Sequence, residues 1–359
     1  MYDTLKSRTS EHCGYVVYCR DTHESKAKTI PKGQHEREGL MSSKLNRRQF
    51  IEKSVLSSAG GAVAVNMSSS DASAQNASTE SMPKGKIGDL EISRILLGGN
   101  LLTHFTHSRD LKYVYNLAAH YNTEEKIKET LAVAEQHGID TLVIHTHPWS
   151  INVIKEYRYK DGGRIKWIIC PTAPIDDSME EYRKQVREVV EMGTDAVYLW
   201  GVRGDELVAK GRPDLMKKAV EIPKEFGVPS GFGAHDLQAV VESEKNNVDP
   251  DFYIKTFHHH NYPTGPKPEE VGKAIAEIPG YWCSNPDEVA DFMNQVEKPW
   301  IAFKVMAAGA IPPENAFQYA FDKGADHVLA GMFDFEISED VRIAKTVLGK
   351  TQRTRPWRS

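Results

Sequence analysis

The sequence lacks several features that would assign it to a simple class of protein. It has 359 residues but only four cysteines and no C-x-x-C spacing, which argues against a disulfide framework or a thiolate zinc site. The formal net charge is −5, and lysine and arginine are interspersed with acidic residues. Neither nucleic acid nor an anionic membrane surface is therefore an expected partner. No G-x-G-x-x-G follows the first predicted strand, so the marker of a dinucleotide-binding open sheet is missing.

The N-terminal region resembles a twin-arginine export signal. Asn46-Arg47-Arg48-Gln49-Phe50 precedes a stretch rich in alanine and glycine that is too short and too mildly apolar for stable membrane insertion. Ala72-Ser73-Ala74 is a plausible cleavage site, and the alternative is a disordered basic tail. We expect an extension or misassigned start at 1–40, a signal at 41–74 and a linker at 75–84. The twin-arginine translocase would then be a partner during export, and the protein would be periplasmic.

The remainder of the chain alternates between short apolar runs and amphipathic stretches, a rhythm typical of βα units around a parallel sheet. The strands are predicted at Ile92–Leu97, Thr141–His145, Trp167–Cys170, Ala196–Trp200, Pro229–Phe232, Phe252–Phe257, Trp300–Val305 and His327–Ala330. The helices between them are predicted at Thr123–His137, Met179–Met192, Asp214–Phe226, Leu237–Lys245, Pro286–Val296, Glu314–Lys323 and Ser338–Leu348. Eight strands predict an α/β protein with a (β/α)8 TIM barrel over residues 85–350, followed by a tail at 351–359. A doubly wound open sheet is the alternative. Residues 103–122 and 261–286 are expected to be long loops above the barrel.

Two stretches resemble the start of aldo/keto reductases. Lys84–Leu102 reads KGKIGDLEISRILLGGNLL, and a helix ending in HG precedes IDTLVIHT. The resemblance implies the barrel fold and, as one alternative function, an NADP-dependent oxidoreductase. The tyrosine of that family's catalytic tetrad has no counterpart, because His145-Thr146-His147-Pro148 occupies the corresponding place. The shared scaffold therefore does not carry over the reaction.

A second resemblance lies at Ala307–Met332, which is similar to the last two strands of barrels that bind a phosphate. Gly309 and Gly331 would offer backbone N–H groups to a cofactor phosphate there. Bulky residues follow Gly331, which departs from the pattern of small residues in such barrels.

Histidines and one aspartate follow several predicted strands, where a barrel gathers polar side chains into one pocket. These candidate ligands of a divalent metal are His145, His147, His235, His258 and His259, with Asp334 after the last strand. A similar distribution occurs in metal-dependent amidohydrolases, although their H-x-H belongs to the first strand. Strand alternation sends His259 to one side and His258 to the other, so the three consecutive histidines cannot all reach one centre.

Two lysines lie within predicted strands. Lys255 is flanked by Ile254 and Thr256, and Lys304 by Phe303 and Val305. Each would either enter the barrel, where burial lowers its pKa, or point outward between helices. If both point inward they would lie close together. Structural ion pairs with Asp334 or Glu336 are the alternative.

These features favour an enzyme that performs metal-assisted or lysine/histidine acid–base chemistry on a small oxygenated, sugar-like molecule. An isomerase, a lyase and a hydrolase all remain open. The predicted catalytic residues are His235, Lys255, Lys304 and Asp334. An NADP-dependent oxidoreductase and a non-catalytic binding barrel are the alternatives.

Overall fold

A computed structural model describes residues 81–109, 111–267 and 283–359, which belong to one compact unit. The twin-arginine motif, the cleavage site and most of the linker lie outside the described residues, as does most of the second predicted loop. Within the described ranges no helix is both long enough and apolar enough to cross a membrane.

Eight parallel strands close into a barrel, which confirms the predicted fold class. A short antiparallel hairpin, β1 (Lys84–Ile87) and β2 (Leu90–Ser93), precedes it. The barrel strands are β3 (Ile95–Gly98), β4 (Thr141–His145), β5 (Lys166–Cys170), β6 (Ala196–Leu199), β7 (Ser230–Ala234), β8 (Phe252–Thr256), β9 (Trp300–Phe303) and β10 (His327–Ala330). They follow one another in sequence order around the barrel, and β10 closes it by pairing with β3.

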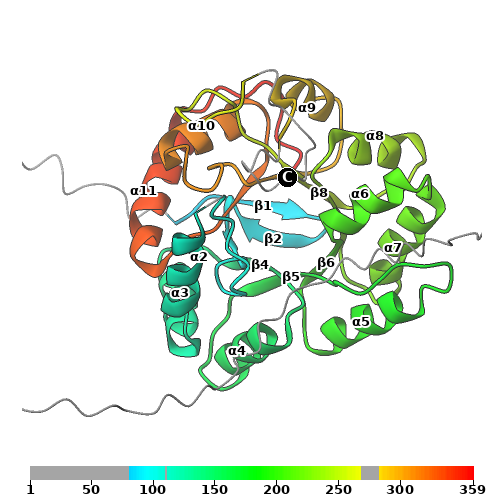
Figure 1. Ribbon diagram of the computed structural model, residues 1–359, viewed down its shortest axis with the longest axis horizontal. Coiled ribbons are helices and arrows are strands. Elements are labelled where there is room, and N and C mark those ends of the chain that lie inside the picture. The colour runs from blue at the N-terminus through cyan, green and yellow to red at the C-terminus, as the bar shows by residue number, and fades with distance from the viewer. Residues whose placement is uncertain (1–80, 110, 268–282) are drawn as a thin grey trace, which may run out of the picture. The chain divides into compact units, whose positions relative to one another are not determined.

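Helices surround the strands as a ring (Figure 1). They are α2 (Lys112–Tyr121), α3 (Glu124–Gln136), α4 (Pro148–Tyr159), α5 (Glu180–Glu191), α6 (Gly201–Ala209), α7 (Pro213–Glu225), α8 (Leu237–Lys245), α9 (Pro286–Met293), α10 (Pro313–Asp322) and α11 (Asp334–Lys350). Where the sequence carries capping signals, the predicted ends agree with the structure. Thr123 accepts a hydrogen bond from the backbone N–H of Lys126 at the start of α3, and Gly138 follows its end with a φ of 87°.

Three helices were not predicted. Helix α2 lies within the stretch expected to be a loop at 103–122, and α4 and α6 follow β4 and β6. None of the three has a side chain that caps its first turn, because Leu111, His147 and Trp200 occupy the N-cap positions. A capping side chain was therefore absent from all three starts, although Pro148 at the first position of α4 is a start signal that was not used.

The first predicted strand, Ile92–Leu97, was wrong as a single element. Ser93 ends the hairpin strand β2, and the barrel strand β3 begins only at Ile95. Between them the Ser93 hydroxyl donates to the Ile95 carbonyl, and the Arg94 N–H donates to the Pro83 carbonyl. These local hydrogen bonds replace strand pairing and turn the chain from the hairpin into the barrel.

Alternate residues of each strand face the barrel axis and the surrounding helices. In β8, Ile254 packs inside the barrel with residues such as Leu96, Val143 and Leu329. Tyr253 belongs instead to the outer cluster between strands and helices. The parity that the sequence left open is thereby decided: Thr256 shares the inward parity of Ile254, and Lys255 points outward.

The last residues of the chain pack across the end of the barrel at which the strands begin. Asp326, fully buried just before β10, forms ion pairs with Arg353 at 3.1 Å and with Arg355 at 3.4 Å. The Ser359 hydroxyl lies 2.6 Å from Nε2 of His327. Asp140 also lies at this end, where it pairs with Lys166 at 2.9 Å. The start of IDTLVIHT, which resembles aldo/keto reductases, therefore contributes to the base of the barrel.

Candidate functional site

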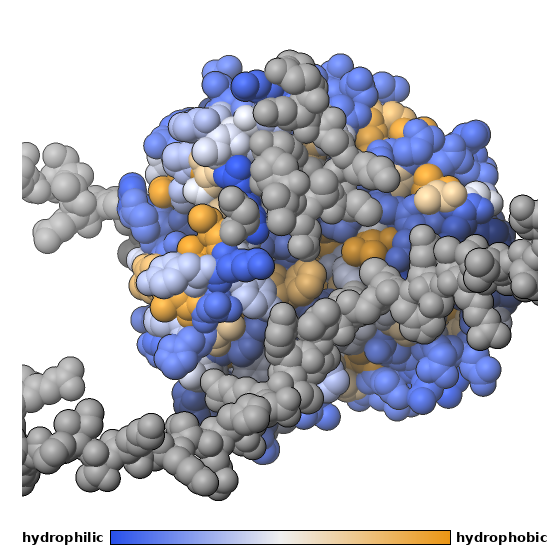
Figure 2. Space-filling model, in the orientation of Figure 1, coloured by the Kyte–Doolittle hydropathy of each residue, from blue (hydrophilic) through white to orange (hydrophobic). Residues whose placement is uncertain are grey.

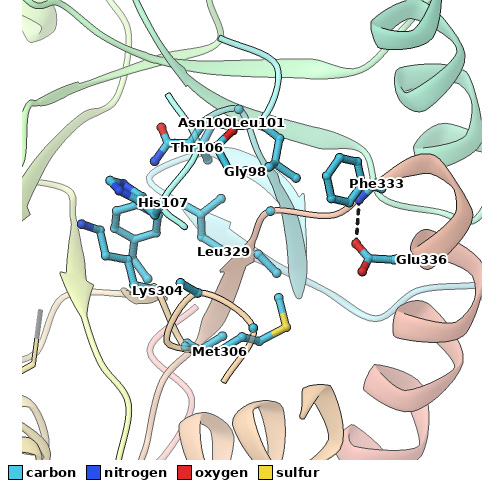
Figure 3. A pocket seen from close by; sticks show the side chains of 18 of the residues that line it. Gly98, Asn100, Leu101, Thr106, His107, Lys304, Met306, Leu329, Phe333 and Glu336 are labelled. Carbon is cyan, nitrogen blue, oxygen red and sulfur yellow. Dashed lines mark hydrogen bonds between the residues drawn. The ribbon is translucent and has the colours of Figure 1, made fainter. Parts of the chain in front are cut away.

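A cavity of about 340 Å³ opens at the carboxyl ends of the strands. The volume is near the lower limit for ligand pockets. The location at the carboxyl ends of the strands is the usual position of active sites in such barrels. Polar side chains on its wall come from the β3 loop, β4, β6, the end of β9 and α11, and they are Asn100, Thr106, His107, His145, Tyr198, Lys304, Glu336 and Asp340. Most of the remaining lining is apolar. Figure 3 shows His107 and Lys304 on one side of Leu329, with Phe333 and Glu336 on the other.

Lys304 reaches this cavity through an unusual backbone conformation. Ala302 faces outward, so strict alternation along β9 would also direct Lys304 toward the helices. Instead Lys304 has a φ of 58°, and Ala307 and Ala308 are left-handed as well. Left-handed non-glycine residues cost on the order of 1–3 kcal/mol each and concentrate at functional sites. The loop is strained in a way that places the Lys304 side chain on the cavity wall.

Two histidines line the same part of the cavity. Burial, followed by the charge of Lys304, holds the pKa of His107 well below 6.5. Burial and then the neighbouring His147 lower the pKa of His145 to about 4. Both imidazoles are therefore neutral near pH 7 and can accept a proton.

His235 lies at the end of β7, close enough to His107 for its charge to lower the pKa of that ring. Its Nδ1 lies 2.8 Å from Oδ2 of Asp205, a residue of α6. The backbone N–H groups of His235 and Asp236 also donate to Asp205. An ionised carboxylate only accepts hydrogen bonds, so Nδ1 carries the proton and Nε2 remains as the basic atom.

The helix that carries Asp205 begins with a glycine for a steric reason. A Cβ on Gly201 would lie 3.0 Å from Cε1 of His235. Any larger residue would press on the imidazole that Asp205 orients. Burial, followed by Lys304, lowers the pKa of His235, although Asp205 acts in the opposite direction.

Lys255 is fully buried behind the barrel wall and is not part of the cavity lining. Its ammonium donates to the carbonyls of His235 and Thr256, each at 2.8 Å, and to the Thr256 hydroxyl. Burial lowers its pKa. Because Lys255 points outward and Lys304 lines the cavity, the two lysines do not form the inward-facing pair that was considered from the sequence.

The predicted metal ligands do not gather around one point. Within the described ranges, no group of three histidine, cysteine, aspartate or glutamate side chains is placed to hold a metal ion. The imidazole planes of His145 and His147 have centroids 6.5 Å apart, and His147 is at the N-cap of α4. His258 is buried beside His260, and His259 packs against Tyr319. Strand alternation and the turn after β8 separate these rings, so the donor set does not fit a metal.

Asp334 is also directed away from the cavity. Its carboxylate accepts a hydrogen bond from Tyr121 at 2.7 Å and pairs with Lys126 at 3.2 Å, linking α11 to α2 and α3. The two predicted cofactor-binding glycines, Gly309 and Gly331, do line the cavity. Gly309 has a φ of 81° and open space where a Cβ would be.

Two carboxylates line the side of the cavity near α11. Asp340 is only 5% exposed, and no hydrogen bond or ion pair joins it to another described residue. Burial, followed by Glu336 and Glu339, raises its pKa to about 7. Glu336, one helical turn earlier, accepts the backbone N–H of Phe333 at 2.9 Å.

Sequence reasoning missed His107, Asp205 and Asp340. His107 lies in the stretch 103–122, which was expected to form a loop above the barrel, but it was not named as a site residue. Asp205 lies in a helix that was not predicted. Asp340 did carry a marker: it is an acid on the apolar face of α11 formed by Ile337, Val341 and Ala344. A charged residue at such a position calls for a partner.

Structural comparisons relate the chain to other barrels. A Pseudomonas aeruginosa protein assigned to the aldo-keto reductases superposes with a TM-score of 0.51 at 15% identity, over 74% of this chain and 94% of its own. The fold is an aldo/keto-reductase-like (β/α)8 barrel. The holo form of an aldo-keto reductase from Bacillus halodurans matches with a TM-score of 0.48 at 11% identity, over 77% of this chain and 100% of its own.

A truncated 3-deoxy-D-arabino-heptulosonate 7-phosphate synthase from Thermotoga maritima matches with a TM-score of 0.46 at 11% identity, over 76% of this chain and 95% of its own. No protein-family model matches the sequence, and no curated protein sequence does. At these identities the likeness concerns the fold alone.

Proposed function

We propose that the protein is an enzyme that catalyses acid–base chemistry, as an isomerase or lyase, on a small oxygenated substrate. One observation carries this proposal. Lys304, His107 and His145 come from separate segments and line one cavity. The Asp205–His235 pair is not part of this lining but lies beside it, close enough to His107 and Lys304 for charge to affect the pKa values of the imidazoles. Neutral imidazoles beside a lysine are the groups that proton transfer next to a carbonyl requires.

In this proposal His235 is the general base. Asp205 fixes its tautomer and its orientation, and Nε2 removes a proton from the carbon next to a substrate carbonyl. The C–H electron pair moves into the C–C bond and the carbonyl π pair moves onto oxygen, which gives an enolate. Lys304 stabilises the negative oxygen as it forms.

The enolate then collapses in one of two ways. In an isomerisation the proton returns to a neighbouring atom, from His235 or from His107. In an elimination a hydroxide leaves with its bonding electrons, and a protonated imidazole supplies the proton that makes it water. The small volume and largely apolar lining favour a compact substrate. A sugar-like molecule is the class we propose.

An NADP-dependent oxidoreductase is the second candidate, favoured by Gly309 and Gly331 on the cavity wall. The first turns of α11 argue against a phosphate beside Gly331, because Glu336 and Asp340 also line the cavity there. Like charges repel in a buried site. Titration with NADPH, monitored by its fluorescence, tests this candidate: saturable binding would favour it over the acid–base proposal.

The decisive experiment measures deuterium incorporation from D₂O, by NMR, into small hydroxyketones, aminoketones and sugars. We expect exchange next to the carbonyl, and we expect Lys304→Met and His235→Gln to slow it by about 10²–10⁴-fold. Lys298→Met, in a surface pair with Asp249, is the control and leaves the rate unchanged. Exchange that persists in both site variants would overturn the proposal. Ligand binding without any exchange would support a non-catalytic barrel.

A further inference from the structure

We infer that Asp340 and Glu336 form a subsite for a protonated amine, so that the substrate carries a primary amine opposite the oxygen that faces Lys304. The cavity has chemically different ends: His107 and Lys304 lie on one side of Leu329 and Glu336 on the other (Figure 3). Asp340, one turn after Glu336 in α11, also lines the cavity. No residue role assigned above uses Asp340. Only the part concerning Lys304 rests on the proposed function.

The burial of Asp340 is the main observation. A carboxylate that is 5% exposed is costly unless a cation or several donors compensate for it. Among the described residues the carboxylate of Asp340 has no hydrogen bond and no ion pair. It nevertheless lines a cavity large enough for a ligand. A ligand group that enters the cavity is placed to supply the missing partner.

The charges around Asp340 favour a cation over a neutral donor. Glu336 lies one turn away on the same helix and also lines the cavity. Burial and the negative charges of Glu336 and Glu339 raise the pKa of Asp340, so the site is short of positive charge. A ligand hydroxyl would donate a hydrogen bond to Asp340 but would leave the repulsion between the carboxylates in place. An ammonium group would both donate hydrogen bonds and neutralise negative charge.

Nearby cations of the chain are directed elsewhere. Arg342 pairs with Glu339 at 2.6 Å on the exposed side of α11, and Lys350 pairs with Glu314 at 3.1 Å. Lys126 pairs with Asp334 and Glu129. These pairs keep the three cations engaged on the outer surface and leave the cavity end of α11 acidic.

The test is calorimetric titration of the whole protein with n-butylamine at pH 8, where the amine is protonated and Asp340 is ionised. We expect millimolar binding that Asp340→Asn weakens at least tenfold and Glu336→Gln weakens less. Glu297→Gln is the matched control, because Glu297 is 73% exposed, pairs with Arg358 and does not line the cavity, and it leaves binding within about twofold. Thermal melting of each variant verifies folding. Equal binding of n-butanol, or butylamine binding that Asp340→Asn leaves unchanged, would overturn the inference.

A second titration separates this inference from the proposed function. In the wild type 4-aminobutanoate should bind more tightly than butylamine, and Lys304→Met should abolish that gain while leaving butylamine binding intact. If the gain is lost but deuterium exchange is absent, the acid–base proposal fails and the amine subsite stands. If exchange occurs and butylamine does not bind, the subsite fails alone.

Discussion

Lys255 and Lys304 lie in neighbouring strands, and their surroundings give them different roles. Lys255 keeps the outward parity of its strand and binds carbonyl and hydroxyl oxygens behind the wall. Lys304 leaves strand geometry at a left-handed residue and lines the cavity. A side chain's chemistry therefore follows from the backbone dihedral that directs it, which residue type alone does not specify.

At the residue scale we predict that Asp340→Asn stabilises the protein at alkaline pH. The pKa of Asp340 is raised from 3.8 to about 7, so the folded state holds a proton that the unfolded state has released. Unfolding free energy is then lost as the pH rises from about 4 to 7, by as much as roughly 4 kcal/mol. Urea unfolding at pH 4 and pH 8 should show the variant gaining stability only at the higher pH. An equal difference at both values would refute this.

A second residue-scale prediction concerns Asp205. Its carboxylate raises the pKa of His235, against burial and Lys304, which lower it. With Asp205→Asn the pKa of His235 falls further. In a plot of exchange rate against pH, the fall in rate on the acidic side therefore moves to lower pH. The maximal rate falls at least tenfold, because the tautomer is no longer fixed.

The measurement is the exchange rate between pH 4 and pH 8. Asp236→Asn is the control, since Asp236 is an N-cap whose side chain accepts from Gln238 and does not bind the imidazole. The same shift of the fall in rate on the acidic side in both variants would show that Asp205 acts as a remote charge and does not position His235.

At the scale of elements, capping residues account for part of the agreement between sequence and structure, although α5, α7, α9 and α10 were predicted without a capping side chain. Helices that begin with a capping residue, such as α3 after Thr123 and α8 after Asp236, were predicted closely. Helices α2, α4 and α6 begin without such a side chain and were not predicted. Helices α4 and α6 bury residues against the barrel, among them Val153 and Leu207, whereas α2 buries only Ala118.

The C-terminal tail supports a prediction at this scale. Arg355 has a side chain that is 1% exposed, and its partner Asp326 is fully buried. Arg355→Met removes one of two arginine partners of a buried carboxylate, and because Arg353 still pairs with Asp326 it should cost roughly 1–3 kcal/mol of unfolding free energy. Arg358→Met is the control, because its partner Glu297 is 73% exposed, and it should change stability by less than about 1 kcal/mol. Equal losses by chemical denaturation would show that the tail contributes contact area and not charge.

At the scale of the whole molecule, exposed apolar side chains lie on α2 and at the start of α11. Most of the face in Figure 2 is hydrophilic, and hydrophobic residues gather near α2 and α11. Leu111, Tyr113, Leu117 and Phe335 are the exposed apolar side chains there, between 55% and 78% exposed.

The export signal that the sequence predicts can be tested directly. Replacing both Arg47 and Arg48 with lysine should abolish processing and periplasmic recovery in cells with a working translocase. Twin-arginine recognition requires the arginine pair and not only positive charge, so Lys44→Arg is the control and should be processed normally. Pulse-labelling followed by fractionation measures both. Processing of the double variant at the wild-type rate would remove the export claim.

The sequence by itself determined the barrel, because alternating apolar runs, helix periodicity and glycine stops are local signals that repeat along the chain. It also placed Gly309, Gly331, His145 and Lys304 near the carboxyl ends of strands. Only the tertiary structure separated His235 from the dispersed histidines, paired it with Asp205 and turned Asp334 away. Those outcomes depend on strand parity, a left-handed residue and contacts between distant segments, and none of these is encoded by a short stretch of sequence.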